Sequence, residues 1–122
     1  MDVSTYHGST DADGDFSNYI IPNTVTTMGG SFGAFQNCNK ITNAPTIPES
    51  VTNINSIFKN CKALTGTVTI NANTSTYDSC FAGVDFETQN LTLSGTSTEL
   101  DTYGATGTNY CTECNGKCQG TH

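Results

Sequence analysis

The amino-acid sequence predicts an α/β fold dominated by β structure: a solenoid of about three 23-residue coils, with short parallel strands and short helical or 3-10 turns. The composition is one reason, because 22 Thr, 13 Asn and 12 Gly in 122 residues favour strands and turns over long helices. The other is a repeat, since Phe35, Phe58 and Phe81 follow one another at one constant interval. A period of about 20 to 29 residues is typical of solenoids with one short strand per coil.

The repeat can be followed from unit to unit. The first unit covers residues 16–38, the second 41–61 and the third 64–84. Two Ile-Pro pairs begin at Ile21 and at Ile47. The interval between them is three residues longer than the interval between the phenylalanines, so the first unit holds three extra residues. We place them at Gly29, Gly30 and Ser31, because such a run favours a turn.

Equivalent residues of stacked coils should form ladders, because parallel strands lie about 4.8 Å apart. Each ladder would be buried inside the coils, and about three coils are the minimum for a stable stack. The predicted ladders consist of Phe35, Phe58 and Phe81; of Ile47, Ile70 and Leu93; and of Ile54, Tyr77 and Leu100.

The predicted strands alternate polar and apolar residues. Residues 67–70, Thr-Val-Thr-Ile, do so as a half-buried strand does, and residues 91–93 do so one coil later. Outward hydroxyl groups suit glycans or polar protein surfaces, and exposed tyrosines suit stacking. The expected ligand-binding face contains Thr42, Thr65, Thr67, Thr69 and Thr92. The tyrosines that could stack on a ligand are Tyr6, Tyr19, Tyr77, Tyr103 and Tyr110.

One spaced pattern points to a family. Residues 47–65 read Ile-Pro-x-x-Val-Thr-x-x-x-x-x-Phe-x-x-Cys-x-x-Leu-Thr. This pattern resembles the BspA-like leucine-rich repeats of bacterial surface proteins and phage-encoded proteins, and residues 64–100 look like the closing segment of such repeats. The resemblance covers about residues 16–100. It implies a leucine-rich-repeat solenoid with a binding role, and it carries over no catalytic motif.

The cysteines fall into two groups. Cys38 and Cys61 occupy repeat positions beside the ladder phenylalanines, and we expect them, like Cys80, to be buried structural residues. The tail carries Cys111, Cys114, Cys118 and His122, in the order C-x2-C-x3-C-x3-H. A structural zinc site, disulfide bonds and an unstructured tail all stay open for this segment. We do not expect a redox site, because no helix-forming run follows the Cys-x-x-Cys pair.

The N-terminal segment is acidic. Asp11, Asp13 and Asp15 alternate with small residues, as in loops that wrap calcium. Neither way of aligning the segment with an EF-hand loop completes the ligand set. We therefore expect a solvated acidic turn, with a weak calcium site as the alternative. The expected domains are an acidic cap at 1–15, the leucine-rich-repeat solenoid at 16–107 and the Cys/His-rich tail at 108–122.

The sequence favours a binding module over an enzyme. Histidine occurs only at His7 and His122, and no catalytic constellation or phosphate loop is present, so no catalytic residue is predicted. The net charge of −7 argues against nucleic acid and anionic membranes as partners. The expected partner is a protein or glycan on a cell surface, and the alternative role is a structural part of a phage virion or tail tip, or a spacer in a larger surface protein.

Location depends on where the native chain begins. The first residues show neither the basic start nor the apolar stretch of a signal peptide. If Met1 is the native start, a phage virion fits, and if the chain is a fragment, a bacterial surface or secreted protein fits. Membrane insertion is not expected, because no stretch approaches the length of a membrane span. Exposed strand edges favour self-association through the ends of the solenoid.

Overall fold

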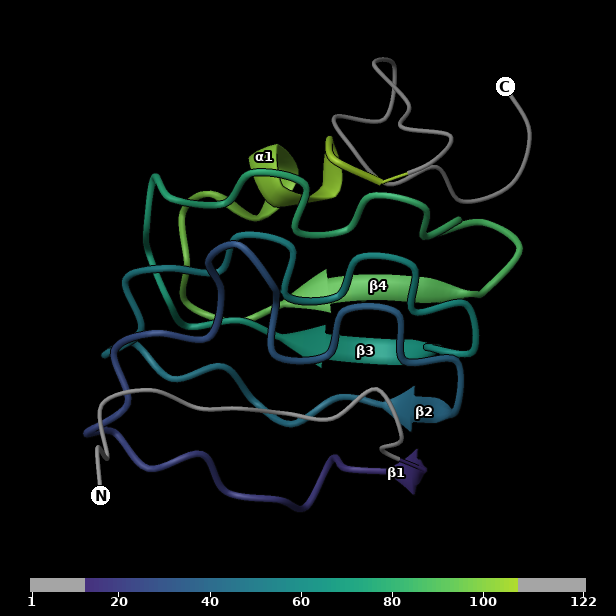
Figure 1. Cartoon of the computed structure of the whole chain (residues 1–122), viewed down its shortest axis with the longest axis horizontal. Helices are drawn as coiled ribbons and strands as arrows, with labels where there is room; N and C mark the ends of the chain where they lie inside the picture. Colours follow the sequence, from purple (N-terminus) through teal and green to yellow (C-terminus); the bar gives the residue numbers. More distant parts are fainter. Residues whose placement is uncertain (1–12, 108–122) are drawn as a thin grey trace.

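The computed structural model describes residues 13–107 and shows a β-dominated chain with short strands and little helix (Figure 1). Its elements are β1 (Gly14–Asp15), β2 (Ile41–Asn43), β3 (Gly66–Thr69), β4 (Leu91–Ser94) and α1 (Leu100–Gly104). Each strand is short because the chain turns back soon after it. We call each stretch of chain that runs once across the molecule and back a passage. The remaining residues form turns and extended segments, as a Thr-, Asn- and Gly-rich composition favours.

Successive passages of the chain lie one above another and pair in parallel (Figure 1). β1 pairs with β2, and β3 pairs with β4. Between these two small sheets, the Thr65 N–H donates to the Thr42 carbonyl over 2.8 Å. Parallel bridges also join Thr27 to Asn53 and Ile47 to Ile70. Residues about one repeat apart in the sequence are therefore direct neighbours.

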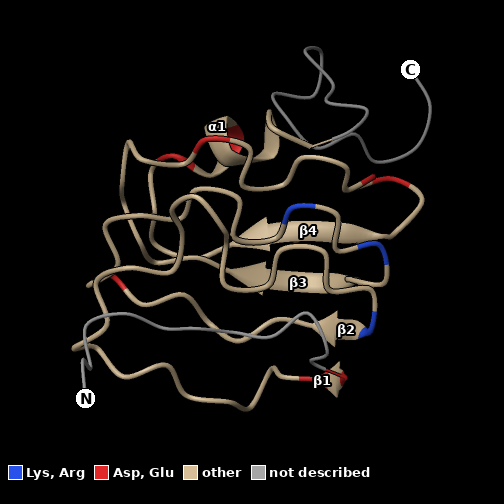
Figure 2. Cartoon of the chain, viewed as in Figure 1, with Lys and Arg blue, Asp and Glu red and all other residues tan. Residues whose placement is uncertain are grey.

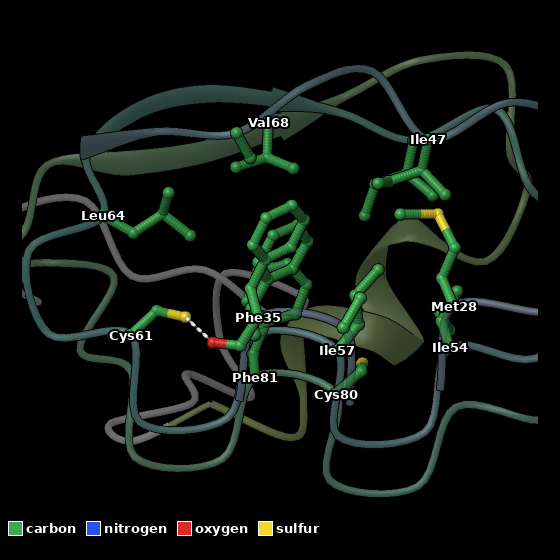
Figure 3. Packing of buried hydrophobic residues seen from close by; sticks show 14 of the residues in the cluster. Met28, Phe35, Ile47, Ile54, Ile57, Cys61, Leu64, Val68, Cys80 and Phe81 are labelled. Carbon is green, nitrogen blue, oxygen red and sulfur yellow. Dashed lines mark hydrogen bonds between the residues drawn. The ribbon is translucent and has the colours of Figure 1, made fainter. Parts of the chain in front are cut away.

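The predicted phenylalanine ladder runs through the core (Figure 3). The rings of Phe35 and Phe58 stack with centroids 5.7 Å apart and an angle of 2° between their planes. Phe58 and Phe81 stack at 5.3 Å. All three side chains are fully buried. At the two ends, Phe16 meets Phe35 edge-on and Phe86 meets Phe81 edge-on, so the aromatic column extends beyond the three predicted members.

The prediction for the second ladder is right for two residues and wrong for the third. Ile47 and Ile70 form a parallel bridge, but Leu93 pairs with Val68. The turn that leads into β4 is two residues longer than the turn that leads into β3, so the pairing of β3 with β4 departs from the interval of the phenylalanines. The Asp85 side chain accepts the Glu87 N–H at 3.1 Å and so shapes this longer turn.

The third ladder also changes at its last member. Tyr103, on α1, is the residue whose ring contacts Tyr77, with centroids 5.6 Å apart. Leu100 is only partly buried against the core. Because Tyr103 is fully buried, the expectation that it could stack on a ligand is wrong. Its hydroxyl accepts the Thr74 N–H at 2.8 Å and donates to the Thr74 carbonyl at 2.8 Å, so it joins α1 to the preceding passage.

The three extra residues of the first unit lie where the sequence places them. Thr27 pairs with Asn53 at the longer interval of the Ile-Pro pairs, whereas Phe35 stacks on Phe58 at the shorter interval of the phenylalanines. The register therefore changes between Thr27 and Phe35. Gly29 is required in this segment, because a Cβ there would lie 2.3 Å from the backbone nitrogen of Asn55.

Asparagine has a structural role at the turns between passages. Asn37 and Asn60 both have φ of 63°, and Gly83 occupies the same repeat position with φ of 80°. Asparagine and glycine tolerate this left-handed conformation better than other residues. The Asn60 side-chain amide also donates to Asn37 Oδ1 at 2.9 Å, which links two neighbouring turns. These turns explain part of the high asparagine content.

Candidate functional site: a threonine face and an adjoining groove

The five threonines predicted to form a ligand-binding face all lie in or next to the parallel strands. Thr67 and Thr69 belong to β3, Thr92 to β4 and Thr42 to β2, and Thr65 immediately precedes β3. We call these five residues the threonine face. Thr67 is exposed and the other four are half-buried. The parallel stacking thus brings side chains from three different repeats into neighbouring positions.

Hydrogen bonds organise the hydroxyl groups of the threonine face. The Thr67 and Thr92 hydroxyls lie 3.1 Å apart, because these two residues are directly paired across β3 and β4. The Thr42 hydroxyl donates to Asn43 Oδ1 at 3.0 Å, and the Thr65 hydroxyl donates to the Gln89 carbonyl. The hydroxyls of Thr42, Thr65, Thr67 and Thr92 are thereby held in place while they keep lone pairs that a ligand can use.

The charged side chains of the described residues lie outside β2, β3 and β4. Among the described residues, the lysines lie on the turns that precede β2 and β3 (Figure 2). Aspartates and glutamates lie near α1, near β1 and on other turns (Figure 2). β2, β3 and β4 contain no charged residue. The threonine face is therefore a neutral, hydrogen-bonding surface.

A groove of about 460 Å³ opens beyond the carboxyl ends of β3 and β4. It is lined by residues of segments 17–23 and 46–49 together with Asn71 and Thr96, and we call it the strand-end groove. Tyr19 is 47% exposed and Ile20 is 79% exposed, so the groove has an apolar side. Within residues 13–107, its lining contains one charged residue, Glu49.

Tyr19 is the only lining residue of this groove for which the sequence predicted a contact with a ligand. The rest were missed because they come from several repeats and form no contiguous motif. The signal that could have found them is the loss of the Ile-Pro pair at Asn71, which the repeat alignment reveals. In the structure Asn71 Oδ1 accepts the Thr96 N–H at 2.9 Å, so the side chain that replaces proline orders the neighbouring passage.

The calcium prediction is only partly within the described residues. Asp13 and Asp15 are exposed, whereas Asp11 lies outside the described range. Asp15 Oδ1 accepts the Ser17 N–H at 2.7 Å, and hydrogen bonds from the Ser17 side chain and backbone hold the pKa of Asp15 below its ordinary value. Within residues 13–107, no group of three His, Cys, Asp or Glu side chains could hold a metal ion. The calcium site stays a prediction.

Cys38, Cys61 and Cys80 are buried free thiols, which confirms the structural interpretation. Cys61 Sγ donates to the Phe35 carbonyl at 3.0 Å (Figure 3). Cys80 lies at the repeat position of Ile57, and the two are neighbours in the core (Figure 3). Burial raises the pKa of Cys61 and of Cys80 to about 12, so both thiols stay protonated near neutral pH.

The four predicted zinc ligands, Cys111, Cys114, Cys118 and His122, lie outside the described residues. Zinc and disulfide bonds in this tail remain predictions. The described part of the chain contains no helix that is long and apolar enough to cross a membrane.

Comparison with known families gives one match. A family model described as "BspA type Leucine rich repeat region (6 copies)" matches residues 12–113, which is most of the chain. This chain belongs to the BspA-type leucine-rich repeat family. The match confirms the resemblance seen in residues 47–65. No curated protein and no solved structure matches the chain.

Membership of the BspA-type family bears on the role of the threonine face. Leucine-rich repeats of this type indicate a repeat-based interaction module, and the family is typically non-catalytic. The neutral, ordered hydroxyl groups of the threonine face fit such a module. They provide hydrogen-bonding positions, and the five residues of the threonine face include no acidic or basic side chain.

Proposed function

We propose that this BspA-type chain is a non-catalytic recognition or adhesion module that binds a protein or glycan on a cell surface through the threonine face. In this proposal the stacked passages form a leucine-rich-repeat solenoid of about three 23-residue coils. One observation carries it: parallel pairing aligns Thr67 with Thr92 on strands that hold no charged residue. An ordered neutral surface favours polar, uncharged partners over nucleic acid or anionic membranes.

The family and the core support the same conclusion. Solenoids expose a broad ordered face, and recognition by such a face needs rigid side-chain positions. The stacked rings of Phe35, Phe58 and Phe81 supply rigidity directly beneath the strands. Because β3 and β4 pair with each other along their shared edge, binding at the threonine face depends on side chains, and single substitutions there should change affinity without unfolding the protein.

The second candidate function is a structural part of a phage virion or tail tip. Two ends of a stacked repeat favour association between copies, and the threonine face would then be a spacer surface. A recognition module fits a location on a bacterial surface, and a structural part fits a location in a phage virion. A stable ring or trimer of the purified chain with no affinity for cells or glycans would select this alternative.

Binding of the labelled full chain to a glycan array and to intact bacterial and host cells tests the proposal. Thr67→Lys places a long cation on the exposed centre of the threonine face, and Thr76→Lys is the matched control because Thr76 is exposed on a different segment. We expect wild type and Thr76→Lys to bind alike and Thr67→Lys to bind at least about tenfold more weakly. Equal binding by both variants, or no binding by wild type, refutes the proposal.

A further inference from the structure

From the strand-end groove we infer a binding site for a linear, uncharged oligosaccharide that lies across successive passages of the chain. This inference rests on the proposed recognition function: it names the ligand class and extends the binding surface from the threonine face into the adjoining groove. The groove has the size of a small-molecule site, since its volume of about 460 Å³ falls within the usual range.

The direction of the groove follows from the residues that line it. Segment 17–23 belongs to the first passage and segment 46–49 to the second, while Asn71 and Thr96 follow β3 and β4. Parallel passages lie about 4.8 Å apart. A ligand in the groove therefore meets a new set of side chains at each passage, which suits an extended chain of similar units.

The side chains match a sugar in chemistry. Tyr19 and Ile20 form an exposed apolar platform, on which the apolar face of a pyranose ring can stack. The Tyr19 ring is positioned by its neighbour Phe16, with centroids 6.1 Å apart, and the Tyr19 backbone N–H donates to the Phe16 carbonyl at 3.0 Å. Hydroxyl and amide groups of Thr46, Asn71 and Thr96 complete the lining with donors and acceptors for sugar hydroxyls.

The backbone along the groove argues against a peptide that adds a strand. Such a peptide needs unpaired backbone groups on a sheet edge. Here the Ile47 N–H donates to the Thr69 carbonyl at 2.9 Å, the Asn71 N–H donates to the Ile47 carbonyl at 2.8 Å, and the Ile70 N–H donates to the Ser94 carbonyl at 2.8 Å. At Ile47, Ile70 and Asn71 these backbone groups are paired with one another, so in this part of the groove a ligand meets side-chain hydroxyls and amides.

Charge selects among saccharides. Among the residues that the structure describes, the lining has one charged group, the carboxylate of Glu49, and the whole chain has a net charge of −7. A sulfated or uronic-acid polymer would be repelled, whereas a neutral sugar can donate hydroxyl hydrogen bonds to Glu49. Charge therefore excludes anionic saccharides, and the hydroxyl and amide groups of the lining suit an uncharged oligosaccharide.

Calorimetric titration of the full chain tests this inference. The probes are chitohexaose and cellohexaose as neutral hexasaccharides, their disaccharides for length dependence, and a heparin hexasaccharide as the charged counterpart. We expect a neutral hexasaccharide to bind with Kd below about 1 mM, and more tightly than its disaccharide and than heparin. Tyr19→Ala should weaken binding about tenfold, and Tyr19→Phe should retain it, because the ring supplies the stacking surface.

Phe32→Ala is the matched control, because Phe32 is 56% exposed and lies outside the groove lining. Unchanged binding by Phe32→Ala together with loss by Tyr19→Ala supports the inference, and a thermal melt checks that each variant is folded. If neutral hexasaccharides bind but respond to Thr67→Lys and not to Tyr19→Ala, the groove is refuted while the proposed function stands. If cells bind but neither hexasaccharide does, the ligand class is refuted. If nothing binds, both proposals fail.

Discussion

Replacing Phe58 by alanine removes the centre of the aromatic column. Phe58 is 0% exposed and lies between two stacked rings, 5.7 Å from Phe35 and 5.3 Å from Phe81. A buried Phe→Ala change lowers the free energy of unfolding by about 3–5 kcal/mol, through lost burial and the cavity that remains. Because both stacking contacts disappear together, and each aromatic pair adds about 0.5–1.5 kcal/mol, we expect a value at the upper end of that range.

That loss is large compared with the total stability of a small domain, which is about 5–15 kcal/mol. Urea unfolding followed by far-UV circular dichroism measures it, since the chain has no tryptophan to report by fluorescence. Phe32→Ala is the same substitution at a side chain that is 56% exposed, and it should change the free energy of unfolding by less than about 0.5 kcal/mol. The melting temperature of Phe58→Ala should fall by about 10 °C or more.

The comparison between the two variants decides the outcome. Equal stability of Phe58→Ala and Phe32→Ala would contradict the stacked column and with it the register of the repeats. A large loss in both variants would instead place Phe32 in contact with the core, against its observed exposure.

Three further predictions concern a buried hydroxyl, a buried thiol and a glycine that lies close to the backbone of a neighbouring passage. Tyr103→Phe removes the hydroxyl that accepts the buried Thr74 N–H, so chemical denaturation should show a loss of about 1–3 kcal/mol. Ionisation of Cys61 should leave the free energy of unfolding constant below pH 9 and lower it progressively toward pH 12. Burial raises the pKa of Cys61 to about 12 in the folded protein, above the ordinary value of 9.0, so only the unfolded thiol ionises in that window. Urea titrations across this range should show a smaller decline for Cys61→Val. Gly95→Ala should destabilise more than Gly30→Ala in thermal melts, although both positions have positive φ, because a Cβ at Gly95 would lie 2.2 Å from the Ile70 carbonyl oxygen and one at Gly30 meets open space.

The period of the sequence predicts the core well where the repeats have equal length. Phe35, Phe58 and Phe81 stack as their spacing indicates, because a fixed interval repeats both the backbone path and the side-chain direction. Leu93 was misplaced because the turn before β4 is longer by two residues. That turn depends on side-chain hydrogen bonds: the Gln89 amide donates to the carbonyls of Cys61 at 3.0 Å and Leu64 at 2.7 Å, which no periodicity reveals.

The candidate site was harder to predict than the core. Alternation of polar and apolar residues was enough to identify Thr67 and Thr92 as outward residues on neighbouring strands. The strand-end groove depends on how the ends of several passages fit together, and Thr46 or Thr96 resembles every other threonine of a threonine-rich chain. The calcium prediction includes Asp11 beside Asp13 and Asp15, and the zinc prediction falls in the tail at 108–122; Asp11 and this tail lie outside the described residues.

The parallel pairing of neighbouring passages has a consequence for how such chains change length in evolution. Thr67 pairs with Thr92 and Ile47 with Ile70, so the loop that must close to form each contact spans about one repeat, wherever it lies in the stack. The entropy of loop closure grows with loop length, and adding a passage lengthens none of the existing loops. Duplicating a whole repeat, such as residues 42–64, is therefore an insertion that the chain can absorb, and each duplication would lengthen both the threonine face and the groove beside it.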